Sequence, residues 1–526
     1  MDRSERRDES LSFVEMAAPL LEMVLCRLVR TIQIKINPMP RRLFVLSIVL
    51  FALRICAVLY AFDHRPVITN NDEIYWAEPA WALNHGDGYR LPCCDGMLFG
   101  DFYPQHPPLF ALILAGSFQL FGFAPAAMRL PSIAAHIASV AMLLTLLWRL
   151  RKLRVLDNWG VAVAALLATT DFSTMYVSRW GRPDPFTSLF ALSGFALLVA
   201  GRMRGPGLRW RAGLASVLVG LSLATHTIAV FYLGLFAIAL WLLRKRLGFT
   251  QIVGCLLLPP LIFVAFWVGA FGDRWLLAMH EHRELAGQMG GMSKPPYRSL
   301  QILTGNINRK EFLQAGGTTA VIIVLSLFCF LFRALSDHRR VRTWLILGVA
   351  LAGQFAMILG ITSLGIPRCY IYYPFTLVVF ALLMTRCAAW LRRPALWAAI
   401  LVATAEIGQT VYVLYGTHRD YAIRSPHRHD ALINRLASYR RVAVIPVLWF
   451  QARERGLDFQ LIDLSVPTQW KEWTSKPHPF EGFDAVVLEA DHQLGTSADL
   501  ANIKPLEFPE PMAEKGLLLY ELHAPQ

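Results

Sequence analysis

The sequence predicts a mainly α-helical protein that crosses a membrane many times. Hydrophobic residues make up 55% of its 526 residues and charged residues only 17%, which is too apolar for a soluble enzyme of this size. A membrane-spanning helix needs about 20 mostly apolar residues, and about eleven segments approach that length: 43–62, 128–148, 160–178, 185–201, 211–226, 227–243, 250–271, 318–332, 343–361, 370–389 and 395–415. Residues 416–526 are soluble in character.

Basic residues follow every second apolar segment. Clusters of lysine and arginine occupy 149–154, 202–211, 244–246, 333–342 and 386–393. The positive-inside rule assigns such loops to the cytoplasm. The formal net charge of +14 therefore orients the chain in a bilayer and does not indicate binding to nucleic acid. With an odd number of spans, the alternate loops and the C-terminal residues are expected outside the cytoplasmic (inner) membrane.

The N-terminal residues 1–42 are expected to form a cytoplasmic segment. They lead into an uncleaved signal anchor, because no small-residue cleavage site follows the first apolar stretch. Met39 is an alternative start.

The neighbouring Cys93 and Cys94 would form only a strained disulfide, so the sequence predicts no disulfide framework. It contains no CxxC metal motif, no P-loop and no GxGxxG.

The first outer loop, residues 63–127, is expected to contain interfacial helices. The stretch "VITNNDEIYWAEPAWALNHG" at 67–86 has the capping-box spacing in Asn70 and Glu73 and ends at a glycine, which is typical of a helix with an aromatic belt at the membrane surface. The apolar run 109–121 is too short to span, so we expect it to lie on the outer surface or to dip into it.

Two further outer motifs carry ionisable residues at the membrane boundary. "STMYVSRWGRPDPF" at 173–186 ends the third span, and "GIPRCYIYYPF" at 365–375 lies at the mouth of the ninth and tenth spans. Ionisable groups at such depths are functional candidates by default. The residues singled out are Arg179, Arg182, Asp184, Arg368, Tyr370 and Tyr373, whereas Tyr372 fits the aromatic belt.

These motifs, in this order, resemble the GT-C superfamily of integral-membrane glycosyltransferases. The branch in question holds protein O-mannosyltransferases, lipid A aminoarabinose transferases and lipopolysaccharide-core transferases. The likeness is strongest over about 70–200, whereas residues 416–526 match no known pattern. It is carried by "NDEIYWAEPAWAL", "HPPLFALILAGSFQLFG", "AAMRLPSIAAHIASVAMLL", "SRWGRPDPFTSLFALSGFALL" and "PRCYIYYPF".

The resemblance implies an inverting glycosyltransferase that moves a sugar from a polyprenyl-phosphate donor to an acceptor hydroxyl on the outer face of the membrane. Asp72 would be the general base, with Glu73 and Asp184 as further catalytic candidates. Arginine and tyrosine donors would stabilise the leaving phosphate. Those donors would be Arg368, Tyr370 and Tyr373, helped by Arg182 or Arg179.

Each of these residues also has a structural interpretation. Glu73 is expected to cap a helix, and Asp184 to pair with Arg179 or Arg182. Arg129 is expected to reach the lipid headgroups by snorkelling. His106 and His226 are candidates for the substrate pocket. With a carboxylate they would hold a divalent metal ion, although two isolated histidines do not make a metal motif and hydrogen-bonded interface histidines are the simpler interpretation. No cofactor follows with certainty.

Two segments outside the spans remain. The outer loop 272–317 is long enough to suggest a function, and we expect it to cover the entrance for donor or acceptor. Residues 416–526 are expected to form a small extracytoplasmic α/β domain. Its helix would occupy 427–439 and its strands 440–450, 459–465, 483–490 and 515–523. This domain would contact the acceptor or serve only as a stabilising cap.

A non-catalytic membrane protein is the alternative function class. A transporter should show broken helices at midplane or paired repeats, and neither is evident in the sequence. A flippase-like component of glycan assembly would share the topology, but Asp72 would be dispensable in it. The sequence does not specify the sugar. The acceptor classes are a lipopolysaccharide core, another lipid-linked glycan, a cell-wall polymer and a protein hydroxyl.

Overall fold

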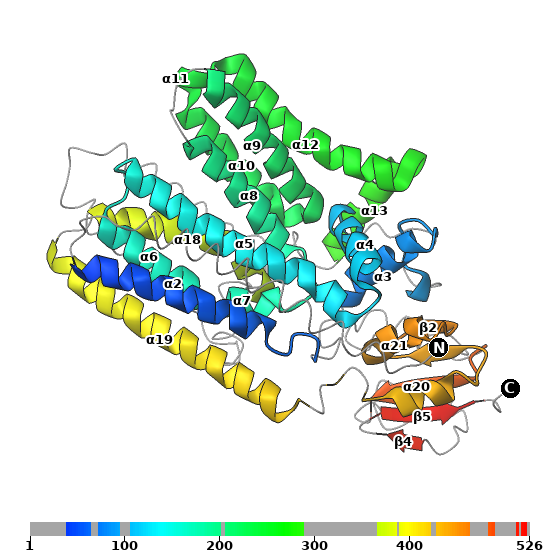
Figure 1. Ribbon diagram of the computed structural model, residues 1–526. Helices are drawn as coiled ribbons and strands as arrows, with labels where there is room; N and C mark the ends of the chain where they lie inside the picture. The colour runs from blue at the N-terminus through cyan, green and yellow to red at the C-terminus, as the bar shows by residue number, and fades with distance from the viewer. Residues whose placement is uncertain are drawn as a thin grey trace.

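The protein is a helical membrane protein with a small β-sheet layer at one end of its helices, as the computed structural model shows (Figure 1). The structure describes residues 38–64, 72–94, 106–200, 206–288, 366–386, 389–421, 425, 428–462, 482–489, 512–514 and 517–522. The long helices are α2 (Pro38–Leu59), α5 (Pro125–Lys152), α8 (Asp184–Val199), α9 (Pro206–Thr225), α10 (Val230–Leu242), α12 (Phe249–Phe271), α18 (Ile366–Arg386) and α19 (Ala389–Arg419).

Within this part of the chain, four helical segments are long and apolar enough to cross a membrane: Pro40–Leu59, Pro125–Lys152, Phe249–Arg283 and Arg392–Arg419. The helices α6 (Asn158–Thr170) and α7 (Phe172–Ser178) pass the same test together and meet at a bend of 43°, so they form either a fifth, broken span or a re-entrant loop. The other predicted spans in the described ranges correspond to helices that do not meet this test alone. The predicted spans 318–332 and 343–361 lie outside the described residues, so the expected count of eleven stays a prediction.

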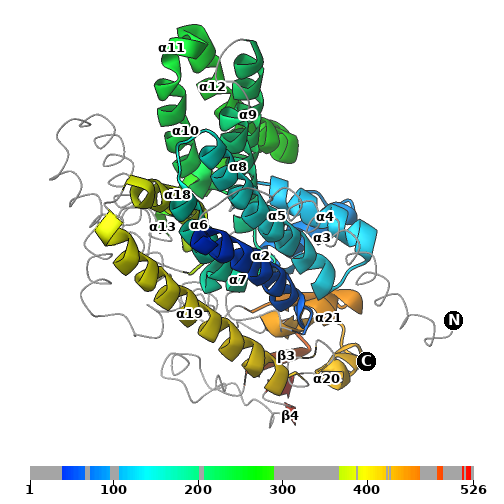
Figure 2. The same cartoon turned by 60° about the vertical axis from the view of Figure 1, so that its left-hand side comes forward.

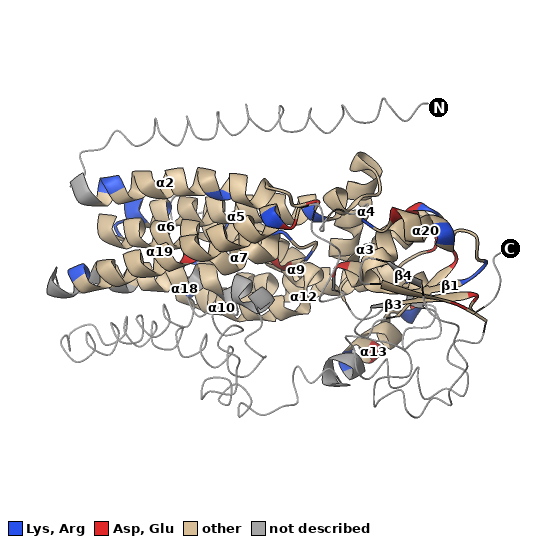
Figure 3. Ribbon diagram, turned by 90° about the horizontal axis from the view of Figure 1, so that it is seen from below, with Lys and Arg blue, Asp and Glu red and all other residues tan. Residues whose placement is uncertain are grey.

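The ends of the membrane helices follow from local chemistry. Asp157 caps α6 by accepting a hydrogen bond from the Gly160 amide at 2.8 Å, and Asp171 caps α7 through the Thr174 amide at 2.8 Å. The last turn of α5 contains Arg149, Arg151 and Lys152, whose positive charges interact favourably with the negative end of the helix dipole. Figure 3 shows basic residues gathered at this end of the helices, far from the sheet.

The helices form two packed groups. One joins α2, α5, α6, α18 and α19 around a common core, and the other joins α8, α9, α10 and α12. Figure 2 shows the second group standing at an angle to the first, and α8 is the helix of the second group that packs against α5 and α18. Gly160 lets α6 approach α18 closely, since a Cβ atom there would lie 2.4 Å from the Ala381 carbonyl oxygen.

The first outer loop contains two short helices, α3 (Asp72–Asn84) and α4 (Leu109–Phe121). Helix α4 behaves as expected for a surface helix, because Phe110 and Leu114 are buried while Leu120 is 79% exposed. Helix α3 corrects the expectation of an amphipathic interfacial helix. Every side chain from 73 to 80 is buried, since α4, α5 and the C-terminal layer pack around it.

The C-terminal layer is a five-stranded sheet in the order β2-β1-β3-β5-β4. Parallel pairing joins β1 (Val442–Val444) to β2 (Phe459–Leu461) and to β3 (Ala485–Glu489). Antiparallel pairing joins β5 (Leu517–Glu521) to β3 and to β4 (Met512–Glu514). The four predicted strand segments contain β1, β2, β3 and β5, whereas β4 was not predicted.

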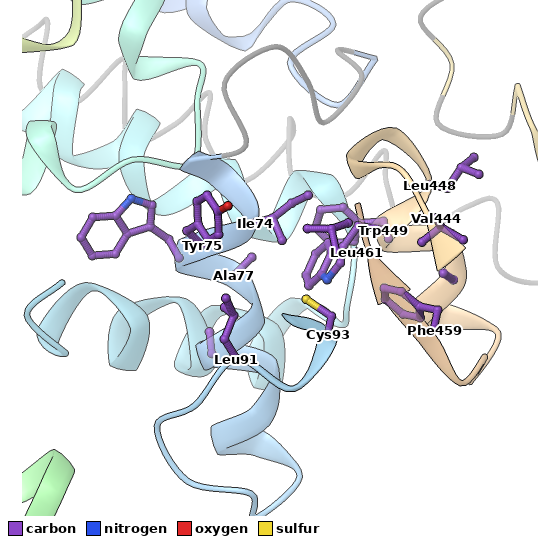
Figure 4. Packing of buried hydrophobic residues seen from close by; sticks show 14 of the residues in the cluster. Ile74, Tyr75, Ala77, Leu91, Cys93, Val444, Leu448, Trp449, Phe459 and Leu461 are labelled. Atoms are coloured by element: carbon purple, nitrogen blue, oxygen red, sulfur yellow. The ribbon is translucent and has the colours of Figure 1, made fainter. Parts of the chain in front are cut away.

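Two short helices, α20 (Asp430–Leu436) and α21 (Trp449–Glu454), belong to the same layer. Their apolar residues share one buried cluster with α3 and α4 (Figure 4). The C-terminal layer is therefore packed against the first outer loop. Whether it is a separate extracytoplasmic domain, as the sequence predicts for 416–526, stays a prediction.

Candidate functional site

Helix α3 begins at Asp72, the residue that the sequence predicts as the general base. The Asp72 side chain lies outside the described residues, so its role rests on where the backbone places it. Positions four residues apart lie on one face of a helix, and Trp76 therefore marks the face of α3 on which Asp72 stands. The surroundings of Trp76 define the site.

The carboxylate next to Asp72 is held by buried partners. Glu73 accepts two hydrogen bonds from Arg129, Nε to Oε1 and Nη2 to Oε2, both at 2.9 Å. Its Oε1 also accepts the Gly181 amide at 2.9 Å, while Arg129 Nη1 donates to the Phe62 carbonyl at 2.8 Å. The bidentate pair joins α3 to α5. The bonds to Phe62 and Gly181 add the residues after α2 and the segment before α8.

This pairing corrects the expectation for Arg129. Its side chain is fully buried and does not reach lipid headgroups. Glu73 forms an ion pair with Arg129 and also accepts the Gly181 amide. Asn70, the other residue of the predicted capping box, lies outside the described residues, so the capping role of Glu73 stays a prediction. Gly181 fits this arrangement because a Cβ atom there would lie 2.7 Å from Met128 Cγ. The absence of a side chain thus lets the Gly181 amide approach Glu73.

The segment before α8 supplies a second ion pair. Arg182 Nε donates to Asp184 Oδ2 at 2.9 Å, and the Asp184 side chain is 1% exposed. This confirms the predicted pairing of Asp184 with Arg182. Arg179 instead donates from Nη2 to the Tyr60 carbonyl at 2.8 Å. The catalytic role of Asp184 and the phosphate-binding roles of Arg182 and Arg179 stay predictions.

The two predicted pocket histidines meet at Trp76. The His106 ring stacks on Trp76 with centroids 3.9 Å apart, and His226 lies 6.2 Å from Trp76 and 6.1 Å from His106. His226 Nδ1 accepts the Ile228 amide at 3.2 Å, so its proton stands on Nε2. The structure therefore brings the two residues together, and their predicted role in the substrate pocket stays a prediction.

Electrostatics place two further groups at this cluster. Burial lowers the pKa of His106 well below its usual value, and electrostatic interactions with His226, His282 and Arg182 lower it further. His282 belongs to α13 (Trp275–Gln288), which lies within the loop 272–317 that we expect to cover the entrance for donor or acceptor. Residues 289–317 of that loop lie outside the described residues, so the covering role stays a prediction. The site thus combines α3, the segment before α4, the segment before α8, the turn before α10, and α13.

A metal ion is not assigned. Among the residues that the structure describes, no group of three or more His, Cys, Asp or Glu side chains is arranged to hold one. The divalent metal suggested by His106 and His226 stays a prediction. In this geometry, the neutral His106 imidazole can donate or accept a hydrogen bond but carries no charge.

Tyr373 of α18 differs from the expectation. The Tyr373 hydroxyl donates to the Leu167 carbonyl at 3.0 Å, and its side chain is 3% exposed in the core between α18 and α6. That hydroxyl has no second proton to donate to a phosphate oxygen. Arg368 and Tyr370 lie on α18, but their side chains are outside the described residues.

No family model matches the chain. The structure is similar to ArnT from Cupriavidus metallidurans bound to undecaprenyl phosphate, with a TM-score of 0.56 and 12% identity, over 91% of this chain and 99% of that one. It is also similar to the apo oligosaccharyltransferase from Archaeoglobus fulgidus, with a TM-score of 0.52 and 12% identity, over 86% of this chain and 71% of that one.

The chain has the GT-C glycosyltransferase fold. A curated relative of this chain is the polyprenol-phosphate-mannose–protein mannosyltransferase of Mycolicibacterium smegmatis (strain MKD8). The two are 25% identical over 188 residues, which cover 32% of this chain and 34% of that relative. The match thus spans about a third of the relative's length.

Proposed function

We propose that this GT-C protein is an inverting glycosyltransferase that moves a sugar from a polyprenyl-phosphate donor to an acceptor hydroxyl at the outer face of the cytoplasmic membrane. The observation that carries the proposal is the convergence at Trp76. Helix α3 directs its Asp72 face toward His106 and His226, and Arg182 is close enough to act on His106 electrostatically. We therefore place the Asp72 carboxylate, the Arg182 cation and the imidazoles of His106 and His226 around one site.

The known relatives support the class of donor. ArnT is described in complex with undecaprenyl phosphate, and the mycobacterial relative is named for polyprenol-phosphate mannose. Both names refer to a polyprenyl chain that carries a phosphate. Such a donor keeps its tail in lipid and presents its sugar at the membrane boundary. The sugar and the acceptor of this chain are left open.

The reaction would proceed as one displacement. The acceptor hydroxyl gives its proton to the Asp72 carboxylate while its oxygen bonds to the anomeric carbon. The bond from that carbon to the phosphate oxygen breaks, and its electron pair leaves with the polyprenyl phosphate. Because the acceptor attacks from the face opposite the phosphate, the anomeric configuration inverts.

The surrounding residues would stabilise charge and orient the sugar. A cation near the leaving phosphate favours the transition state most strongly where water is excluded. We assign this role to Arg182 and, on α18, to Arg368 and Tyr370. His106 and His226 would hydrogen-bond sugar hydroxyls. Asp184 would hold the Arg182 guanidinium in place through the 2.9 Å bond.

The test is donor turnover by the purified protein in lipid nanodiscs. Polyprenyl-phosphate mannose and other polyprenyl-phosphate sugars are supplied singly, and released polyprenyl phosphate is measured by chromatography. We expect turnover of at least one donor, and a loss of about 10²–10⁴-fold in Asp72→Asn. The matched control is Asp87→Asn, an outer-loop carboxylate that pairs only locally with Arg90 at 2.7 Å.

Two outcomes would overturn the proposal. One is a folded wild-type protein that turns over none of these donors. The other is Asp72→Asn with the same rate as Asp87→Asn. The second outcome would favour the non-catalytic alternative, in which Asp72 only begins a helix.

A further inference from the structure

The C-terminal layer contacts α3 through polar groups as well as through its apolar core. We infer that Trp449 and Arg453 of α21 are positioning residues for α3, the helix that begins at Asp72. The inference rests on the proposed function, because it gives these two residues a role in placing the proposed base. It makes the C-terminal layer part of the catalytic unit and not a removable cap.

The contact centres on Glu78, whose carboxylate is fully buried. Its Oε2 accepts hydrogen bonds from Trp449 Nε1 at 2.7 Å and from Arg453 Nε at 3.1 Å. Its Oε1 accepts the Cys93 amide at 3.1 Å and a bond from Arg453 Nη2. A buried carboxylate is costly unless such donors surround it. Glu78 therefore fixes α21 to the middle of α3.

Two aromatic rings contact the Arg453 guanidinium. Its Cζ lies 4.2 Å from the Trp81 ring centroid on α3 and 4.5 Å from that of Phe459 on β2. Burial by itself would lower the pKa of Arg453, but the Glu78 carboxylate has the larger opposite effect, so the pKa is raised above its usual value. Arg453 thus bridges α3 and the sheet as a cation.

The apolar core continues this contact. Trp449 has no exposed surface and stacks edge-on against Phe123 with ring centroids 5.5 Å apart. Figure 4 shows Trp449 between Ile74 and Cys93 on one side and the sheet residues Phe459 and Leu461 on the other. A movement of α21 would therefore be transmitted to α3 through packed side chains.

Two contacts on different faces determine how α3 is rotated about its axis. Glu73 binds Arg129 and Gly181 at the start of the helix, and Glu78 binds α21 one and a half turns later. Five residues turn an α-helix by about 500°, so these two side chains point about 140° apart. Holding both faces leaves α3 little freedom to rotate, and its rotation sets the direction of Asp72.

Helix α3 also needs outside support. Pro79 lies inside it and lacks the amide that would bond to the Tyr75 carbonyl, which weakens the helix at that turn. The Glu78 contact lies next to this weak point. Because a misplacement of about 1 Å in a catalytic group can cost about 10²-fold in rate, loosening α21 would lower turnover before it unfolds the protein.

The experiment compares three variants of the full chain in nanodiscs. Arg453→Lys keeps the charge but loses the forked donor geometry, and Trp449→Phe keeps the ring but loses the Nε1 donor. Arg435→Gln is the matched control, since it breaks the exposed Arg435–Glu521 pair of the same layer. For each variant, kcat and KM for the polyprenyl-phosphate donor are measured well below the unfolding midpoint, together with that midpoint.

We expect kcat to fall about 10-fold or more in Arg453→Lys and by a smaller factor in Trp449→Phe, with KM within about twofold of wild type. Arg435→Gln should keep the wild-type kcat. A purely stabilising contact would lower only the unfolding midpoint and leave kcat per folded molecule unchanged. That result in both α21 variants would overturn the inference.

Asp72→Asn in the same assay separates this inference from the proposed function. If Asp72→Asn is inactive while both α21 variants keep the wild-type kcat, only the positioning role is wrong. If Asp72→Asn is fully active, the proposed base is wrong, and the positioning role is lost with it. If Arg453→Lys does not fold, Trp449→Phe alone decides, because it changes no charge.

Discussion

Two buried polar clusters of this protein hold the two ends of one segment, residues 171–184, by different means. The boundary cluster consists of Glu73, Arg129, Arg182 and Asp184, and each of its carboxylates is paired with an arginine at 2.9 Å. The bundle cluster consists of Arg54, His136, Asp171, Thr174 and Glu406. Its carboxylates accept backbone amides at the start of α7, from Phe172 at 2.6 Å and from Thr174 at 2.8 Å.

The arginine of the bundle cluster also bonds differently. Arg54 donates from Nε to His136 Nε2 at 2.9 Å and from Nη2 to the Thr174 hydroxyl at 2.6 Å. In the boundary cluster each carboxylate is therefore bonded to an arginine, whereas the bundle carboxylates accept hydrogen bonds from backbone amides and the Thr174 hydroxyl, with the Arg54 charge nearby. We expect neutral side chains of the same shape to be tolerated in the bundle cluster and not at the boundary.

The largest effect is expected for Arg129→Met. This change leaves the Glu73 carboxylate buried with its bidentate partner removed, and breaking such a pair costs about 3–5 kcal/mol. Thermal unfolding in detergent should show the loss as a much lower midpoint. The double variant Arg129→Met/Glu73→Gln also removes the charge of Glu73 and should recover part of the lost stability. A double variant no more stable than Arg129→Met would show that charge is not what holds the boundary cluster.

A smaller effect is expected for Glu406→Gln in the bundle cluster. The amide oxygen of glutamine can still accept the Phe172 amide, so the loss should be about 1 kcal/mol. Glu406→Leu removes the acceptor and should cost more. Equal unfolding midpoints for the two variants would mean that the Phe172 bond does not matter, and the contrast between the clusters would fail.

The smallest effect is a pH dependence that comes from His106. Its folded pKa is lowered by burial and by nearby positive charge, so below the unfolded value the unfolded chain binds more protons than the folded one. The free energy of unfolding is therefore highest above pH about 6.5 and declines as the pH falls below that value. Unfolding midpoints between pH 5 and 7.5 should fall less steeply in His106→Gln. An unchanged slope would contradict the enclosed position of this ring.

Local patterns explain which parts of the fold could be predicted from sequence. Helix α4 lies between Pro108 and Gly122, as its boundary residues indicate, and β2 lies in the predicted segment 459–465. Asp184 and Arg182 are two positions apart, so their pairing was visible in the sequence. In each case the signal lies within a few residues of the feature.

Contacts between distant segments explain what the sequence could not show. Glu73 and Arg129 are 56 positions apart, and Glu78 and Trp449 are 371 apart, so no spacing rule connects them. The burial of α3 follows from helices and strands that pack around it from the rest of the chain. Tyrosine is a residue type that is common at membrane–water interfaces, but the close packing of α18 on α6 places Tyr373 in a core.

The most direct test of the central claim compares two adjacent carboxylates, Asp72 and Glu73, in one preparation. Turnover of the polyprenyl-phosphate donor and the unfolding midpoint are measured for Asp72→Asn and Glu73→Gln. The account predicts that Asp72→Asn loses turnover by about 10²-fold or more with little change in midpoint. It predicts that Glu73→Gln lowers the midpoint, while its folded molecules still turn over at a rate reduced by a smaller factor than in Asp72→Asn. Turnover that survives in Asp72→Asn but is lost in folded Glu73→Gln would contradict it.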